Sequence, residues 1–118
     1  MTDLVASISS DEKGWTHVER LINGQEWGKV FLIAEDSAKK NFRTEKEVEY
    51  VVIDARKPVF ELIDDIRNGL NGKITDLEVA LNLVSGSGKE HMALLSAMLK
   101  LGVGVRLIAV TKDGIKEL

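Results

Sequence analysis

The sequence contains no cysteine, only one proline, and few aromatic residues. Without cysteine there is no disulfide framework, no thiol nucleophile and no cysteine-ligated metal. No apolar run approaches the roughly 20 residues that a helix needs to cross a bilayer. The first residues, MTDLVASISSDEKG, also lack the basic segment followed by an apolar run that marks a signal peptide. We therefore expect a soluble, cytoplasmic protein that binds no membrane and needs no metal or other cofactor.

Positive charge is also scarce. The 16 lysines and arginines are outnumbered by 19 acidic residues, and the formal net charge is −3. Sequence-independent binding of duplex nucleic acid needs a wide basic face, so we expect no duplex partner. A small anionic ligand remains compatible with this balance, because a few lysines and backbone amides can hold it locally.

The 118 residues, of which 44% are hydrophobic, fit a single domain spanning residues 1–118. Apolar runs rich in β-branched residues alternate with helical patterns, which predicts a parallel sheet with helices on both faces. The fold class expected is α/β, a Rossmann-like three-layer sandwich with a mostly parallel sheet of five to six strands. The strands are expected at residues 4–9, 30–34, 48–53, 77–84 and 105–110. The final segment, TKDGIKEL, predicts a hairpin into a short antiparallel strand.

The stretch NLVSGSGKEHMALL looks at first like the phosphate loop of a nucleotide hydrolase. That loop requires G-x-x-x-x-G-K-[ST], but Leu83 stands in place of its first glycine and Glu90 in place of its hydroxyl residue. A nucleoside-triphosphate hydrolase loop is therefore excluded. A glycine-rich turn that leads from a strand into a helix still brings backbone N–H groups close to an anion. The alternative is a turn whose glycines serve only the packing of helix against strand.

A second polar turn follows the first strand, in the segment SISSDEKGW. In open α/β sheets, ligands bind just outside the carboxyl ends of the strands, so this turn and SGSGK are expected on one rim. The alternative is that Ser10 or Asp11 caps the next helix while Glu12 and Lys13 face solvent. The two turns together predict a ligand site with these contacts: Ser9, Ser10, Asp11, Lys13, Ser85, Gly86, Ser87, Gly88 and Lys89.

At these two turns the sequence resembles the CRISPR-associated Rossmann-fold (CARF) sensor domains. In that family the first strand ends in a hydroxyl residue followed by DEK-like residues, as in SISSDEKGWTHVERLI here. A late strand runs into T-G-G-T-K-x-M, an apolar helix, a G-V stop and a final strand. The matching stretch is LNLVSGSGKEHMALLSAMLKLGVGVRLIAVTKDGIKEL, in which Ser85 to Lys89 align with T-G-G-T-K. Ser87 replaces the second glycine, Gly88 replaces the threonine, and His91 stands where the family has methionine.

The resemblance implies a homodimer that binds a cyclic oligoadenylate across its two-fold axis in CRISPR-linked antiviral signalling. A two-fold ring suits two copies of each turn, because symmetry doubles every contact. Since the chain ends at Leu118, we expect a stand-alone member without an effector domain. Such a member either acts as a sensor by binding or is a metal-independent ring nuclease. For cleavage, the resemblance gives Lys89 the role of stabilising charge and Ser10 or Ser9 that of positioning the reacting groups.

Histidine could take part in such chemistry as an acid or base. His91 is one candidate, although a helix histidine is more often structural, and His17 is expected at the surface. The ring size, and the choice between sensing and cleavage, are open at this point.

Two alternatives come from other classes of protein. YVVIDARKP resembles the phospho-acceptor strand of receiver domains, with Asp54 as the acceptor and Asp11 and Glu12 as a magnesium-binding pair. Ser85 and Lys112 would take the family's hydroxyl and lysine roles, but Ser9 and Ser10 separate the acids from the strand. The second alternative is a ligand-free dimeric interaction module. Its dimer contacts would lie on the apolar helix HMALLSAMLKL: Met92, Leu95, Met98 and Leu99.

Overall fold

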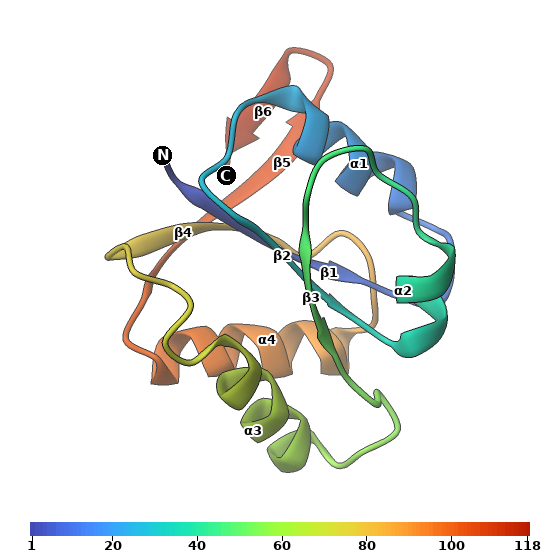
Figure 1. The fold of residues 1–118 in the computed structure, drawn as a ribbon, viewed down its shortest axis with the longest axis vertical. Helices are drawn as coiled ribbons and strands as arrows, with labels where there is room; N and C mark the ends of the chain where they lie inside the picture. The colour runs from blue at the N-terminus through green and yellow to red at the C-terminus, as the bar shows by residue number, and fades with distance from the viewer.

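The computed structural model describes all 118 residues and consists of a six-stranded sheet with helices on both faces (Figure 1). The elements in chain order are β1 (Asp3–Ile8), α1 (Trp15–Gly24), β2 (Val30–Ala34), α2 (Asp36–Asn41), β3 (Glu49–Val52), α3 (Val59–Leu70), β4 (Glu78–Asn82), α4 (Gly88–Lys100), β5 (Gly104–Thr111) and β6 (Gly114–Glu117). This is the α/β class that the alternation of patterns predicts. None of the helices is both long and apolar enough to span a lipid bilayer.

The strands are ordered β3-β2-β1-β4-β5-β6. Strands β1 to β5 are parallel, and β6 pairs antiparallel with β5 through the predicted hairpin. From β1 the chain first moves outward through β2 to β3, then returns to the other side of β1 and moves outward through β4 to β5. The direction of winding therefore reverses between β1 and β4. Such a switch point is where open α/β sheets bind ligands.

Both faces of the sheet are buried, which explains why the strands appear as continuous apolar runs rather than alternating ones. All six residues of β1 and all five of β2 are buried. On one face Leu4, Ala6 and Ile8 pack with α1 and α2. On the other face Val5 packs with α3 and α4, which lie together below the sheet in Figure 1. The central strands are thereby fixed, and the loops at their carboxyl ends start from a rigid base.

Two helix starts differ from the sequence-based expectation, and both lie in the turns of interest. Helix α1 begins at Trp15 rather than near residue 11, because Gly14 takes the left-handed conformation (φ 84°) just before it. Helix α4 begins at Gly88, whereas its apolar pattern predicts a start at Glu90, because Ser87 caps it. The turn after β1 is therefore longer than expected, whereas the turn after β4 keeps its expected length and lies two residues earlier, at 83–87 instead of 85–89.

Candidate functional site at the carboxyl rim of β1 and β4

The turns that follow β1 and β4 are bonded directly to each other. The two strands pair in parallel, with Ala6 opposite Asn82, so both turns leave the sheet at the same rim. The Ser7 hydroxyl donates to the Ser85 carbonyl, and the Ser9 backbone N–H donates to Ser85 Oγ at 2.9 Å. A Cβ atom added to Gly14 would lie 3.2 Å from the Cα and Cβ of Ser85. The segments that the sequence singled out separately thus form one structural unit.

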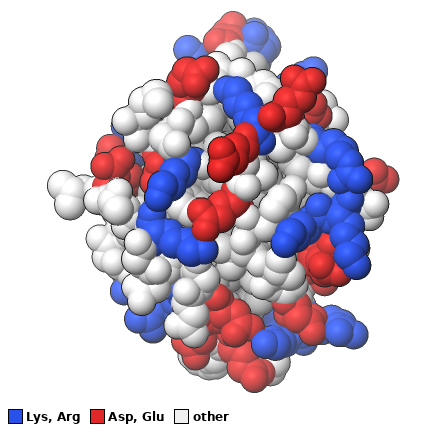
Figure 2. Space-filling model, in the orientation of Figure 1, with Lys and Arg blue, Asp and Glu red and all other residues white.

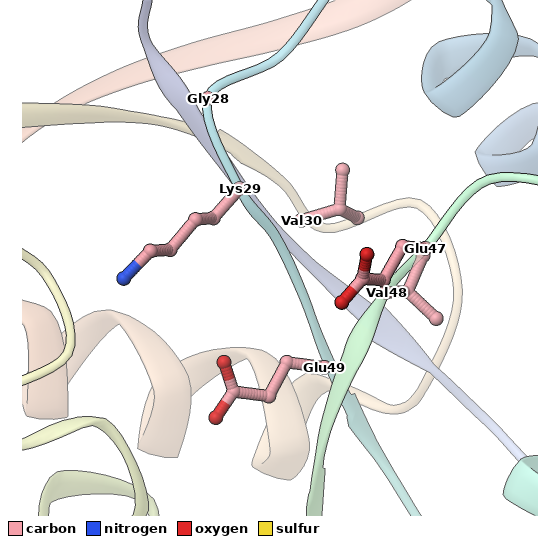
Figure 3. Close-up of a pocket in the computed structure, with 6 residues that line it drawn as sticks. All are labelled: Gly28, Lys29, Val30, Glu47, Val48 and Glu49. Carbon is pink, nitrogen blue, oxygen red and sulfur yellow. The ribbon is translucent and has the colours of Figure 1, made fainter.

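A shallow hollow of about 340 Å³ lies between the two turns. Its lining comes from both of them: Ser9, Asp11, Lys13, Val84, Gly86, Ser87 and Glu90. A hollow of the same volume lies at the amino ends of β2 and β3, between Lys29 and Glu49 (Figure 3). The two hollows cannot be told apart by volume. The one at the carboxyl rim is the better candidate for a ligand site because it lies at the switch point of the sheet.

The first turn of α4 borders this hollow, because Ser87 and Glu90 line it. Ser87 Oγ accepts the N–H of Glu90 at 3.3 Å, and the Glu90 carboxylate accepts the N–H of Ser87 at 3.1 Å, which completes a capping box. The N–H groups of Gly88 and Lys89 donate to no other group of the chain. Free N–H groups at the positive end of a helix dipole favour an anion. The first turn of α4 therefore carries two unbonded backbone donors next to Ser87 and Glu90, which line the hollow.

The charged side chains around the hollow are of both signs. The Lys13 ammonium is accompanied by the carboxylates of Asp11 and Glu90. Ammonium and amide groups donate hydrogen bonds, whereas carboxylates only accept them. A ligand that combines a phosphate with hydroxyl or amino groups, such as a nucleotide, matches this lining better than a bare anion does. The wider surface is also mixed in charge, and the face shown in Figure 2 carries no broad basic area.

The turn after β1 is held in place by its own polar groups. Ser9 Oγ accepts the Asp11 N–H at 3.2 Å, and Asp11 Oδ1 accepts the Lys13 N–H at 3.1 Å. The Trp15 indole donates to the Ser9 carbonyl at 2.8 Å. These bonds fix the backbone of the turn, so Lys13 lies at the hollow in a preformed loop.

Ser85 occupies the middle of the site, but its hydroxyl is not free to contact a ligand. Its side chain is buried, with 1% of the residue exposed, and the hydroxyl accepts the Ser9 N–H. The Ser85 carbonyl is also bonded to His91 Nε2 at 2.8 Å. Ser85 therefore holds the two turns together, and His91 supports it from α4.

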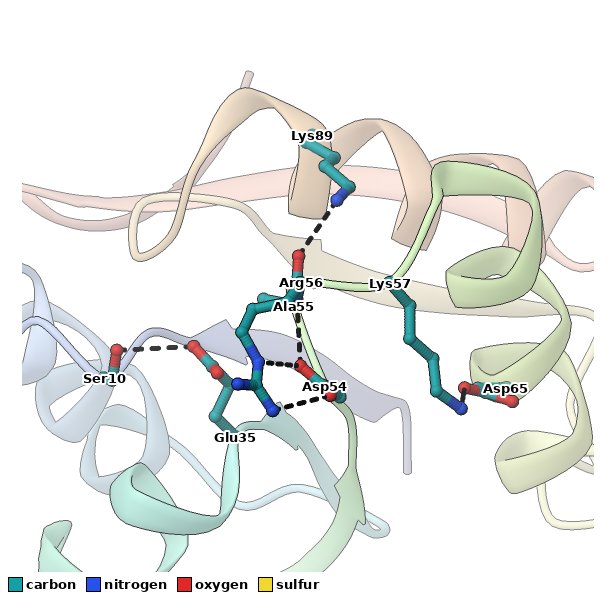
Figure 4. Close-up of polar contacts among 8 residues, drawn as sticks. All are labelled: Ser10, Glu35, Asp54, Ala55, Arg56, Lys57, Asp65 and Lys89. Carbon is teal, nitrogen blue, oxygen red and sulfur yellow. Dashed lines mark hydrogen bonds and ion pairs between the residues drawn. The ribbon is translucent and has the colours of Figure 1, made fainter.

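The structure does not bring Lys89 and Ser10 together, although the sequence pairs them as the catalytic candidates. Lys89 Nζ donates to the Ala55 carbonyl at 3.0 Å, and the Ser10 hydroxyl donates to Glu35 Oε1 at 3.3 Å (Figure 4). Neither side chain lines the hollow. The roles of both side chains stay predictions.

His17 is not a surface residue, contrary to the sequence-based expectation. Its ring is half-buried, and Nε2 accepts hydrogen bonds from Asn82 Nδ2 and from the Val110 N–H, each at 3.2 Å. Burial, with a smaller contribution from Arg20, lowers the pKa of His17. The buried Asn82 also donates to the Ile108 carbonyl at 2.9 Å and accepts the Val84 N–H. His17 and Asn82 therefore tie α1, β4 and β5 together. Asn82 is not among the candidates taken from the sequence, although a polar residue at the end of an apolar strand could have indicated this network.

The order of the strands argues against the receiver-like alternative. Receiver domains have the order 2-1-3-4-5, in which the third strand pairs with the first. Here β3 is the edge strand, and β2 separates it from β1 and from Asp11. Asp54 is paired with Arg56, from Nε to Oδ1 at 3.0 Å, and the hydrogen bond from Arg56 is the main cause that lowers the pKa of Asp54. The geometry that the alternative needs around Asp54 is absent.

No three histidine, aspartate or glutamate side chains gather as a metal site would require. The chain matches no protein-family model, and comparison with curated proteins finds no significant similarity. The assignment of a function therefore rests on the geometry of the rim and on the resemblance of its two turns to those of CARF domains.

Proposed function

We propose that the protein is a cytoplasmic, homodimeric sensor of cyclic oligoadenylate of the CARF type, acting in CRISPR-linked antiviral signalling. One observation carries this proposal: the turn at residues 9–13 and the turn at residues 85–89 meet around a single hollow at the switch point of the sheet. These are the two segments in which the sequence resembles CARF domains.

The groups around the hollow match the chemistry of an adenylate. A phosphate of the ring lies by the first turn of α4, where the N–H groups of Gly88 and Lys89 are unbonded, and Lys13, which lines the hollow, adds a positive charge. Asp11 and Glu90 supply acceptors for the hydroxyl and amino groups of the nucleoside. Because each nucleotide of the ring repeats the same groups, a second copy of the hollow across a two-fold axis binds the opposite side of the ring.

The exposed face of α4 supplies a surface for this dimer. Met92 and Leu99 are 65% and 66% exposed, and the half-buried Leu95 lies between them at helical spacing. Met98, expected from the sequence to be a dimer contact, is completely buried and belongs to the core. Because α4 begins at the hollow, a two-fold contact along this helix joins the two binding sites into one assembly.

Binding rather than cleavage is the activity that the geometry supports. The candidate pair for ring cleavage, Lys89 and Ser10, faces different neighbours outside the hollow. The ring-nuclease hypothesis has no observation of its own in its favour, and we treat cleavage as an outcome to be tested alongside binding.

Calorimetric titration with cyclic tetra-adenylate and cyclic hexa-adenylate, followed by chromatography of the recovered ligand, tests the proposal. We expect one of the rings to bind with one ring per two chains and to be recovered intact. Lys13→Ala should weaken binding, while Lys29→Ala, at the opposite end of the strands, should not. Linear fragments in the eluate would establish the ring nuclease instead, and no heat with either ring would overturn the proposal.

A further inference from the structure

Glu35 lies next to the candidate site, although the sequence did not indicate it as a site residue. It is the first residue after β2, and the pairing of Ile8 with Ala34 places it on the same rim as Ser9. The Ser10 hydroxyl donates to Glu35 Oε1 at 3.3 Å (Figure 4). The two residues after β1 thus connect the hollow, which Ser9 lines, with the end of β2.

The carboxylate of Glu35 is largely unused within the chain. Glu35 is the N-cap residue of α2, but its side chain makes no capping hydrogen bond. It forms no ion pair, because the nearby Arg56 is paired with Asp54 instead. Its one hydrogen bond, from Ser10, is long for an O–H donor to a carboxylate, which normally lies near 2.5 to 2.7 Å. A half-buried carboxylate with so weak a partner is available to accept a hydrogen bond from a ligand.

A further open hollow, of about 500 Å³, begins at Glu35 and extends along the ends of β2 and β3. It is lined mainly by polar and charged side chains, including Glu35, Ser37, Asp54, Arg56 and Lys57. This volume lies within the roughly 300–1,000 Å³ range of small-molecule sites. A nucleotide whose phosphate lies at the β1–β4 hollow therefore has room for its sugar at Glu35 and for its base beyond it.

We infer that Glu35 accepts a hydrogen bond from the ribose 2′-hydroxyl of the bound nucleotide, in place of the one it now accepts from Ser10. A carboxylate binds the ribose 2′-hydroxyl in dinucleotide-binding folds of this winding, where the phosphate lies at the turn after the first strand. In a ring with 3′–5′ linkages the 3′-oxygen is esterified, so the 2′-hydroxyl is the free one. The inference rests on the proposed function and adds a subsite that selects ribonucleotides over deoxyribonucleotides.

Titration with cyclic tetra-adenylate and with its all-2′-deoxy analogue tests this inference. The unaltered protein should bind the ribose ring about tenfold or more tighter, the usual effect of one hydrogen bond to a charged group. Glu35→Ala should weaken binding of the ribose ring by that factor and leave the deoxyribose ring unaffected. The control Glu47→Ala removes an exposed carboxylate at the opposite end of the strands and should change neither.

The possible failures are distinguishable. Equal weakening of both rings by Glu35→Ala, or a ribose preference that survives it, would overturn the role of Glu35 while leaving the proposed function intact. Failure of the unaltered protein to bind these rings, and to bind cyclic hexa-adenylate as well, would overturn both. Circular dichroism of Glu35→Ala shows whether the variant is folded, and Glu35→Gln, which keeps an acceptor oxygen without the charge, should retain part of the ribose preference.

Discussion

Ser85 is the residue on which the geometry of the rim depends most. Its hydroxyl accepts the Ser9 N–H, and its carbonyl is bonded to the Ser7 hydroxyl and the His91 ring. Gly14 lies directly against it, in a left-handed conformation that would strain any other residue. A hydroxyl that the sequence offers as a ligand contact thus positions the groups that do face the hollow.

Ser85→Ala should destabilise the fold, because it leaves the Ser9 N–H without its partner in a partly buried place. We expect a loss of about 1–2 kcal/mol in the free energy of unfolding, measured by urea denaturation. Ser10→Ala removes an exposed serine hydroxyl from the neighbouring turn and should cost within about 0.5 kcal/mol. Equal effects of the two substitutions would contradict the structural role of Ser85.

His17 should make the stability of the protein depend on pH. Burial lowers its pKa in the folded chain, whereas the unfolded chain titrates near the ordinary value of about 6.5. Between these two pKa values the unfolded state binds more protons, so the free energy of unfolding falls as the pH falls through that window. Urea denaturation at several pH values should show a steeper acid loss for the unaltered protein than for His17→Gln, which cannot titrate. Identical pH profiles would show that the imidazole of His17 is not constrained as described.

At the scale of the element, the stability of α4 depends on the hydrogen bonds of its first turn. Ser87 and Glu90 form a reciprocal capping box, which the S-x-x-E spacing permits and the structure realises. Ser87→Ala should lower the free energy of unfolding by about 1 kcal/mol, and Ser87→Gly by less. Thermal unfolding of the three proteins provides the comparison. If Ser87→Ala unfolds at the temperature of the unaltered chain, the cap contributes nothing.

The outer face of α4 should control the oligomeric state. Leu99→Lys places a charge on the proposed dimer surface, so sedimentation analysis should show a shift from dimer to monomer. Phe60→Lys is the matched control, because Phe60 is 79% exposed on the neighbouring helix α3. A monomeric unaltered protein, or an equal effect of Phe60→Lys, would contradict the placement of the interface on α4.

The strands and helices were predictable from the sequence where burial makes their residues apolar. The residues at which the helices begin were not predictable. The apolar runs identify β1 to β5, and the Asp-Gly pair identifies the hairpin to β6. The start of α1 was missed because it depends on a single glycine, Gly14, in a left-handed conformation. The site was predictable as two turns, but the direction of Lys89 depends on a carbonyl 34 residues away, which no local pattern records.

At the scale of the whole molecule, the strand order decides between interpretations that the sequence leaves open. Alternating strands and helices fit both the order 3-2-1-4-5 and the receiver order 2-1-3-4-5. In the order found here the chain crosses β1 after β3, whereas in the receiver order it crosses after the second strand. The packing of segments distant in the sequence decides between the two. The order found here removes Asp54 from the centre of the sheet and leaves the β1 and β4 turns facing one another.

The central claim is that a cyclic oligoadenylate binds where these two turns meet. Amide resonances recorded by nuclear magnetic resonance during titration with cyclic tetra-adenylate and then cyclic hexa-adenylate test it most directly. We predict that the resonances of Lys13, Gly86, Gly88 and Lys89 shift with the bound ring, while those of Gly28 and Lys29, at the other end of the strands, stay in place. Shifts confined to the amino ends of the strands, or no shifts with either ring, would contradict the account.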